Sequence, residues 1–331
     1  MSFWSYNVAS PKLWHTLGFW KPHYLRERPA SVPYTPQGLT AYHRLNRADT
    51  QMVCDLWTKH YGGEDWYLDA NPAWVQSYLD DPSVIVLGVF TIRENALVGT
   101  IVSTPFSGGA TRFHQTQDIS DVRVIEGLCI HSRFRKLGIA GYLIYAMDYE
   151  TSKRPTIHFW SRETPAPPLL STALVIQTYA FVQCKDIVCM ESCLPIPWPE
   201  MVLLWSTLRS PGIVARVPVN RGGLEAWEVN GTIMVVSDTK RKTKRTREPI
   251  WEVIWTGQIR GEELVSGPIP LRYLESLAAK KTGILFVTKS NTDDAFTPPW
   301  QFGTSGVQSW YIYNFCPDFR NGQLEALREE I

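Results

Sequence analysis

The stretch that decides the fold runs from Ile125 to Gly141 and reads IEGLCIHSRFRKLGIAG. Apolar residues dominate it as far as Ile130, which predicts a β-strand, and a short basic loop follows. Small residues at Gly138, Ala140 and Gly141 then open a helix. Backbone N–H groups in the first turn of a helix have no partner within the helix, and small residues let a phosphate approach them. The stretch therefore predicts a phosphate-binding turn.

The loop between this strand and this helix carries positive charge at Arg133, Arg135 and Lys136. Cations beside unpaired backbone N–H groups favour an anion, and the order of strand, basic loop, small residues and helix is met in full. An ordinary strand-to-helix turn with solvated cations is the alternative. His131 follows the strand directly, and we expect it to cap the loop or to lie beside the phosphate.

Composition places the chain among globular proteins. Of its 331 residues, 44% are hydrophobic and 20% are charged, with 33 Lys and Arg against 32 Asp and Glu. These figures exclude disordered, coiled-coil, collagen-like and disulfide-scaffold chains, and the length predicts two domains. The near-neutral charge argues against a surface built for nucleic acid, so no DNA partner is expected.

One basic run stands apart from this balance. Residues 240–247 hold six cations and no acid. Such a run binds ribosomal RNA or an acidic membrane surface weakly, or it forms a solvated hairpin tip between two strands.

The pattern along the chain predicts a mixed α/β protein. Residues 1–38, rich in proline and aromatic side chains, are expected to lie over the folded body, with a first unit over 39–190 and a second over 191–331. Helices are expected over 48–60, 72–80, 137–150, 169–178 and 270–281. Strands are expected over 39–45, 84–92, 97–104, 121–131, 156–161, 179–190, 224–237, 250–259, 283–289 and 308–315.

The cysteines and the apolar runs bear on location and metal binding. The six cysteines fall mostly in apolar runs, and no run approaches the about 18 apolar residues that cross a membrane. With no secretion signal at the start of the sequence, we expect reduced thiols and a cytoplasmic protein. Cys184, Cys189 and Cys193 match no zinc spacing, so no metal is expected.

Residues 135–140, Arg-Lys-Leu-Gly-Ile-Ala, resemble the acyl-CoA signature Arg/Gln-x-x-Gly-x-Gly/Ala of the GNAT acyltransferase superfamily. Further segments, in order along the chain, resemble N-myristoyltransferase, which consists of two GNAT units. They are Phe3-Trp4 with Pro11-Lys12-Leu13, residues 33–38, 56–72 and 97–105, and residues 310–317. The chain is identified as a divergent N-myristoyltransferase-like member of the superfamily with a shortened second half. The resemblance implies two GNAT-like units in tandem, each a mixed, mostly antiparallel sheet flanked by helices.

The resemblance also implies the donor, a fatty acyl-CoA and most specifically myristoyl-CoA. Its pyrophosphate would lie on residues 135–140, and backbone N–H groups of Gly127 and Leu128 would polarise the thioester carbonyl. Donors fixed at a developing oxyanion are usually the largest catalytic contribution. The residues implied to contact the acyl-CoA are Phe3, Trp4, Leu128, Cys129, Ile130, Arg133, Arg135, Lys136, Leu137, Gly138, Ile139 and Ala140.

The implied acceptor is the N-terminal glycine amine of a protein or peptide. The base would be the main-chain carboxylate at the C-terminus, which here belongs to Ile331. Glu126, an acid on an apolar strand, is a rival base, because several GNAT acetyltransferases place one there. The acidic turn that receives a basic substrate residue would fall at Glu64 and Asp65, with Tyr67 beside it.

Three functions are therefore open: N-myristoyl transfer to glycine, acetyl transfer with Glu126 as base, and binding without catalysis. The chain departs from the family at Gly127, where the family has a large apolar residue, and at Leu137 and Gly138, where the family is basic. Long-chain acyl transfer by a monomer is the leading expectation.

Overall fold

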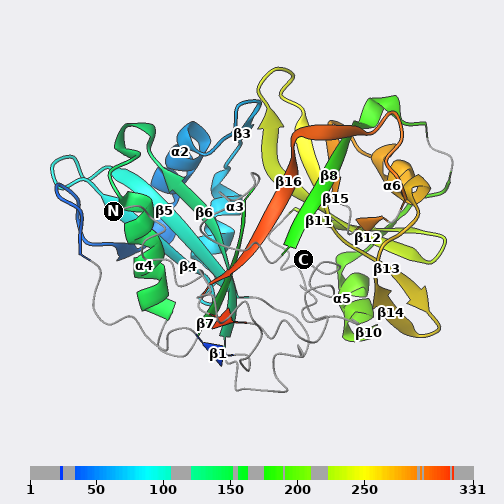
Figure 1. Cartoon of the computed structure of the whole chain (residues 1–331), viewed down its shortest axis with the longest axis horizontal. Coiled ribbons are helices and arrows are strands. Elements are labelled where there is room, and N and C mark those ends of the chain that lie inside the picture. Colours follow the sequence, from blue (N-terminus) through cyan, green and yellow to red (C-terminus); the bar gives the residue numbers. More distant parts are fainter. Residues whose placement is uncertain are drawn as a thin grey trace.

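The computed structural model of the chain describes residues 23–24, 34–105, 121–151, 156–162, 175–188, 191–209, 223–288, 291–292, 294–313 and 315–316. Phe3, Trp4 and Ile331, to which the resemblance gives roles, lie outside these residues. So do residues 169–174 of the helix expected over 169–178. The described part consists of two halves, which strands shared between them join (Figure 1). The first half is built mainly from the described residues between 34 and 162, and the second half mainly from those between 191 and 300.

Fifteen strands form one sheet that runs through both halves. From one edge it passes through β2 (His43–Arg44), β4 (Ile85–Phe90), β5 (Leu97–Pro105), β6 (Asp121–Ile130), β7 (Thr156–Arg162) and β16 (Gln301–Tyr313). It continues through β8 (Val175–Gln183), β15 (Ile284–Thr288), β13 (Pro249–Arg260), β12 (Thr232–Thr243), β11 (Leu224–Val229) and β9 (Leu194–Ile196). Outside this path lie β3 (Trp66–Leu68), β10 (Leu208–Arg209) and β14 (Glu263–Ser266), while β1 (His23–Tyr24) and β17 (Phe315–Cys316) pair separately.

Among the described strands, the parallel pairs are β6 with β7, β13 with β15, and β10 with β14. The remaining pairs are antiparallel, so the expected mixed, mostly antiparallel sheet is confirmed. No helix in the described ranges offers an apolar stretch long enough to span a bilayer.

The sheet has the same order when it is read from either end. β4, β5 and β6 are antiparallel neighbours, α4 (Ile139–Thr151) crosses to the parallel strand β7, and β16 follows. β11, β12 and β13 repeat this order, α6 (Leu271–Ala278) precedes the parallel strand β15, and β8 follows. β16, from late in the chain, thus completes the first half, and β8, from earlier in the chain, completes the second half. The unit boundaries near residues 38 and 190 stay predictions.

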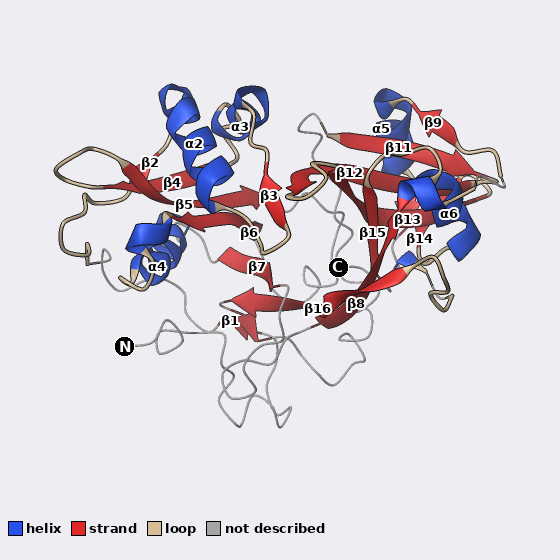
Figure 2. Cartoon of the chain, turned by 90° about the horizontal axis from the view of Figure 1, so that it is seen from above, coloured by secondary structure: helices blue, strands red, loops and turns tan. Residues whose placement is uncertain are grey.

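Helices cover both faces of the first half (Figure 2). On one face lie α2 (Thr50–His60) and α3 (Pro72–Leu79), and the Asn71 side chain caps α3. Their core includes Val53, Trp57, Val75 and Val102. α4 packs on the opposite face through Ile139, Leu143 and Met147. The helices expected over 48–60, 72–80 and 137–150 are confirmed to within two residues at each end.

In the second half, α5 (Trp198–Ser206) and α6 each pack on a core of their own. The strand expected over 224–237 is instead a hairpin, because Asn230 and Gly231 turn the chain with φ angles of 51° and 74°. Residues 175–178, expected to end a helix, begin β8, since Val175 and Ile176 are β-branched and favour a strand.

Candidate functional site

Strand β6 is interrupted by a β-bulge at Gly127. The register between β5 and β6 shifts by one between Thr100 and Val102, so Gly127 and Leu128 face one residue of β5. Gly127 has a φ of 59°, a left-handed angle that glycine adopts without steric cost. A Cβ there would lie 2.6 Å from Val102 Cγ2 and 3.2 Å from Trp57 Cζ2. Backbone angle and packing therefore both require glycine.

The bulge decides which face of the sheet each side chain of β6 occupies. Side chains alternate along a strand, and one extra residue reverses the alternation. Glu126 therefore faces a cavity, Leu128 packs toward α4, and Cys129 packs toward α2. Burial raises the pKa of the Cys129 thiol to about 12, so this residue, implied to touch acyl-CoA, stays a protonated core side chain.

Beyond the bulge β6 has an open edge. Its parallel pairing with β7 begins with Asp121 opposite Thr156 and ends with Val124 opposite Phe159. β7 then continues beside β16, while β6 follows β5 to Ile130. From Ile125 onward, no described strand pairs with the edge of β6 that faces β7. An unpaired strand edge presents N–H and C=O groups to whatever lies beside it.

Arg135 fastens the basic loop to the first half. Its guanidinium donates to Ile130 O at 3.3 Å and to His60 O at 2.8 Å, at the end of α2. Arg133 and Lys136 are exposed. One cation thus fixes the path of the loop, and two remain at its surface.

The loop enters α4 through Gly138, whose φ is 80°. Tyr142 N donates to Gly138 O at 3.0 Å, so the N–H groups of Ile139, Ala140 and Gly141 have no partner inside the helix. A Cβ on Gly138 would meet nothing within 4 Å, so the space beside the helix start is open. Residues 135–140 thus combine exposed cations with N–H groups that are unpaired within the helix at its start, and phosphate binding there stays a prediction.

Two histidine rings lie against each other beside this loop, with the centroids of His60 and His131 4.0 Å apart and the ring planes tilted by 42°. His131 Nδ1 accepts from Arg133 N at 3.2 Å, so His131 caps the loop, one of its two expected roles. His60 Nδ1 accepts from Ser132 N at 3.4 Å, and burial, together with the nearby His131 and Arg135, lowers the pKa of His60. Neutral rings held this way carry the proton on Nε2. In the described ranges, no group of three or more His, Cys, Asp or Glu is placed to hold a metal ion.

A cavity of about 260 Å³ lies between the two halves, against the bulge. One wall is aromatic and consists of Trp57, Tyr61, Trp74 and Tyr78. Three carboxylates also line it: Glu126 from β6, Asp238 from β12 and Glu252 from β13. Glu126 makes no hydrogen bond or ion pair with any residue that the structure describes. Arg241 lines the cavity too, so aromatic faces are combined with more acidic than basic side chains, a combination that attracts cations.

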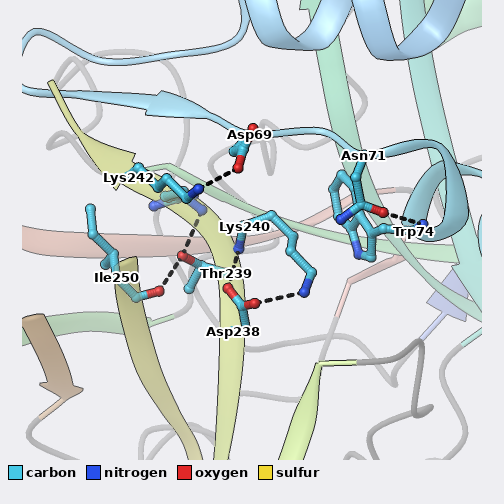
Figure 3. A network of polar contacts seen from close by, with 9 residues as sticks. Asp69, Asn71, Trp74, Asp238, Thr239, Lys240, Lys242 and Ile250 are labelled. Carbon is cyan, nitrogen blue, oxygen red and sulfur yellow. Dashed lines mark hydrogen bonds and ion pairs between the residues drawn. The ribbon is translucent and has the colours of Figure 1, made fainter. Parts of the chain in front are cut away.

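Of the two ion pairs in Figure 3, one lies within β12 and the other ties the second-half wall to the first half. Lys240 Nζ lies 2.6 Å from Asp238 Oδ2, and Lys242 Nζ lies 2.6 Å from Asp69 Oδ2. The hydrogen bond to Asp69 raises the pKa of Lys242. Asp69 N also donates to Lys240 O at 2.7 Å. Figure 3 shows Asp69 entering from the first-half chain above the strand that carries the two lysines.

The basic run 240–247 is the tip of the β12–β13 hairpin, and it docks on the first half. β12 pairs with β3, and the Arg241 guanidinium lies 4.3 Å from the Trp66 ring centroid. Lys244 Nζ donates to Gly63 O at 2.9 Å. Lys240, Arg241, Lys242 and Lys244 are thus used inside the molecule, while Arg245 and Arg247 are exposed. The run is therefore a hairpin tip, but it packs against the first half instead of being surrounded by solvent.

The acidic turn expected to receive a substrate peptide lies under this tip. Asp65 O accepts from Lys244 N at 2.8 Å, and Tyr67 is the register partner of Lys242. The side chains of Glu64 and Asp65 are exposed and do not line the cavity. The structure thus brings Glu126 and Gly127 to the cavity, and it places Glu64, Asp65 and Tyr67 beside the hairpin tip, outside the cavity lining.

Thr100, Asp238 and Glu252 are among the polar residues at the site that have no counterpart among the residues expected from sequence. Thr100 and Glu252 interrupt apolar strands, which is the signal that singled out Glu126. Asp238 lies where β12 becomes basic, and no sequence signal marks it.

Comparison with solved structures identifies proteins that have the same architecture. Saccharomyces cerevisiae N-myristoyltransferase with bound myristoyl-CoA matches with a TM-score of 0.70 at 9% identity, over 96% of this chain and 88% of that chain. The chain has the N-myristoyltransferase fold. Two further structures of the yeast enzyme with bound myristoyl-CoA, one also with inhibitors, match with TM-scores of 0.66 and 0.64 at 10% identity. Each covers 95% of this chain, and 92% and 89% of the respective yeast chains. No protein-family model and no curated protein matches the sequence.

Proposed function

We propose that this chain is an acyl-CoA-dependent acyltransferase that carries a myristoyl group to the N-terminal glycine amine of proteins or peptides. One observation carries the proposal: Glu126 and Gly127 line the cavity, and the open edge of the same strand leads from them to the basic loop. A donor along that edge and an acceptor in the cavity would meet at the bulge. The N-myristoyltransferase fold, known here from structures that hold myristoyl-CoA, supports this arrangement.

The donor lies between the basic loop and the bulge. The pyrophosphate occupies the first turn of α4, where backbone N–H groups and the exposed Arg133 and Lys136 favour an anion. The thioester carbonyl lies beside the N–H groups of Gly127 and Leu128, and one such donor is worth about 3–4 kcal/mol in the transition state. The resemblance assigns Phe3 and Trp4, which lie outside the described residues, to the acyl chain.

The acceptor amine enters the cavity as an ammonium. A carboxylate takes one proton, the neutral nitrogen attacks the thioester carbon, the C–S bond breaks, and CoA leaves as a thiol with the second proton. The resemblance assigns the base to the carboxylate of Ile331. Glu126 is the described carboxylate beside the bulge without a partner, so it is the rival base.

Release of free CoA thiol tests the function. We expect release with myristoyl-CoA and a peptide that begins with glycine, and none when the glycine amine is acetylated beforehand. A second candidate is an acetyltransferase with Glu126 as base, which the unpartnered carboxylate in the cavity favours. Turnover with acetyl-CoA alone would select it, and acyl-CoA binding without turnover would indicate a binding protein.

Two variants separate the bases. Deletion of Ile331 is expected to abolish the chemical step while acyl-CoA binding survives, because a repositioned carboxylate no longer reaches the amine. Glu126→Gln tests the rival, and Glu262→Gln, on an exposed turn, is the matched control. Full activity without Ile331, combined with loss in Glu126→Gln, would assign the base to β6.

The same proposal includes a cytoplasmic, monomeric protein. The buried free thiols of Cys54, Cys129, Cys184 and Cys193 fit a reducing compartment. Weak contact with ribosomal RNA or an acidic membrane would use Arg245 and Arg247, since the other four cations of the tip are engaged.

A further inference from the structure

The carbonyl group of Gly127 is held by a buried relay of two side chains. Trp57 Nε1 donates to Thr100 Oγ1 at 2.8 Å, and Thr100 Oγ1 donates to Gly127 O at 3.2 Å. Trp57 is 3% exposed and Thr100 is 0% exposed. Because the relay is shielded from water, its hydrogen bonds meet little competition.

The relay fixes the direction of one peptide group. In a trans peptide, the carbonyl of one residue and the N–H of the next point in opposite directions. Because Thr100, on β5, holds Gly127 O, the Leu128 N–H is directed away from β5. That direction leads to the edge of β6 that β7 leaves unpaired. The bulge also leaves Leu128 without a register partner on β5.

A glycine at this position makes such an anchor necessary. Glycine adopts positive and negative φ angles about equally well, so the peptide that follows Gly127 is free to rotate unless something holds it. Trp57 packs against the glycine and also begins the relay. A donor held in advance costs no reorganisation when charge develops on an oxygen.

We propose that Trp57 and Thr100 are positioning residues that aim the Leu128 N–H at the thioester carbonyl of a bound acyl-CoA. Both act through the Gly127 carbonyl. The role toward the thioester rests on the proposed function, whereas the anchoring of the carbonyl rests on the two hydrogen bonds alone.

Variants at Thr100 separate the relay from ordinary packing. Thr100→Val removes the hydroxyl at nearly constant volume, and Thr100→Ser keeps it. Thr256→Val is the matched control, because Thr256 Oγ1, in a side chain 4% exposed, donates to Gly267 O at 2.8 Å in the second half. Both valine variants lose one buried hydroxyl bonded to a glycine carbonyl.

The first readout needs no ligand. In the free protein, Thr100→Val is expected to shift the carbonyl carbon resonance of Gly127 and the amide resonance of Leu128, whereas Thr100→Ser and Thr256→Val leave them in place. Unchanged resonances in Thr100→Val would overturn the relay, whatever the protein binds.

The second readout is the infrared stretching frequency of myristoyl-CoA labelled with carbon-13 at its carbonyl. Binding is expected to lower the frequency in wild type and to lower it less in Thr100→Val, with kcat reduced roughly 10- to 100-fold and KM unchanged. Thr256→Val should match wild type in both. An equal frequency in wild type and Thr100→Val would overturn the positioning role.

The two proposals fail separately. A lowered carbonyl frequency without transfer to any amine would refute acyl transfer and retain the positioning role. A wild-type protein that binds no myristoyl-CoA would refute the proposed donor and, with it, the role of the relay toward a thioester.

Discussion

The two halves of the sheet carry a bulge at corresponding places and use it differently. In the first half, β6 has its extra residue opposite β5. In the second half, β13 has its extra residue, Ile254, opposite β12. Both bulged strands reach the cavity, through Glu126 and Gly127 on one side and Glu252 and Ile254 on the other. The repeat therefore brings two similar strands together at one cavity.

The strand edges beyond the two bulges differ. The pairing of β6 with β7 ends at Val124, and no described strand takes over. β13 pairs with β15 over residues 250–252, and β14 then takes the same edge from Gly257 to Arg260. A strand fills in the second half the position that stays open in the first. One plan, used twice, thus leaves a strand edge of the first half unpaired among the described residues.

The indole N–H groups near the two bulges also differ in their hydrogen bonding. In the first half, the indole N–H of Trp57 is bonded to Thr100. In the second half, the indole nitrogens of Trp205 and Trp255 are buried with no hydrogen-bond partner among the described residues. The indoles of Trp205 and Trp255 therefore serve packing, whereas the indole of Trp57 also orders the backbone.

At neutral pH, the largest effect is expected from glycine substitutions at two positive φ angles. Gly127→Ala should lower the free energy of unfolding by about 3 kcal/mol, because left-handed strain adds to overlap with Val102. Gly231→Ala, with a φ of 74° and nothing within 4 Å of a Cβ, should lose only about 1 kcal/mol. Urea unfolding measures both. Equal losses would mean that the bulge is not tightly packed.

The contribution of histidine to the pH dependence of stability is expected to reside in the first half, because all seven histidines lie at or before His158. Burial, with the charge of Arg123, lowers the pKa of His158 from 6.5 to about 3. Between these values the unfolded chain binds a proton that the native protein does not, so stability falls as pH falls, by up to about 1.4 kcal/mol per pH unit.

His158→Gln should remove this slope, since glutamine does not titrate. Urea midpoints of wild type and variant between pH 6.5 and pH 3 make the comparison. Parallel curves would show that His158 does not cause the acid sensitivity.

A smaller effect is expected from paired tryptophan substitutions. Trp57→Phe should cost about 1–2 kcal/mol, because it removes a buried hydrogen bond as well as volume. Trp255→Phe removes an indole that has no described partner, so it should cost less. Thermal unfolding of both variants tests the order. A larger loss for Trp255→Phe would contradict the division between packing and ordering.

The smallest effect concerns the link between the halves. Lys242→Ala should change the free energy of unfolding by about 0–1 kcal/mol, because the side chains of Lys242 and Asp69 are 38% and 48% exposed. The loss should disappear in high salt and in the presence of Asp69→Asn. A loss of several kcal/mol would show that the halves depend on this pair.

Local pattern predicted the decisive stretch well. Residues 125–141 form the strand, basic loop and helix that their apolar run, cations and small residues indicate, and the N-myristoyltransferase fold expected from short motifs is confirmed. Local pattern does not determine which strands pair across long separations. It therefore placed the start of β8 in a helix, and it did not show that the tip at 240–247 docks on β3. The bulge was missed for the same reason, since the register of β6 depends on β5.

The place of β16 in the sheet has a consequence for biosynthesis. β16 pairs with β7 and β8 at once, yet it emerges only after the whole second half has been made. Until then a nascent chain exposes two strand edges in the middle of the future sheet, and such edges invite association with other chains. Pairing over so long a separation is also slow. Closure of the sheet by β16 is thus the step at which a growing chain is most in need of protection by chaperones.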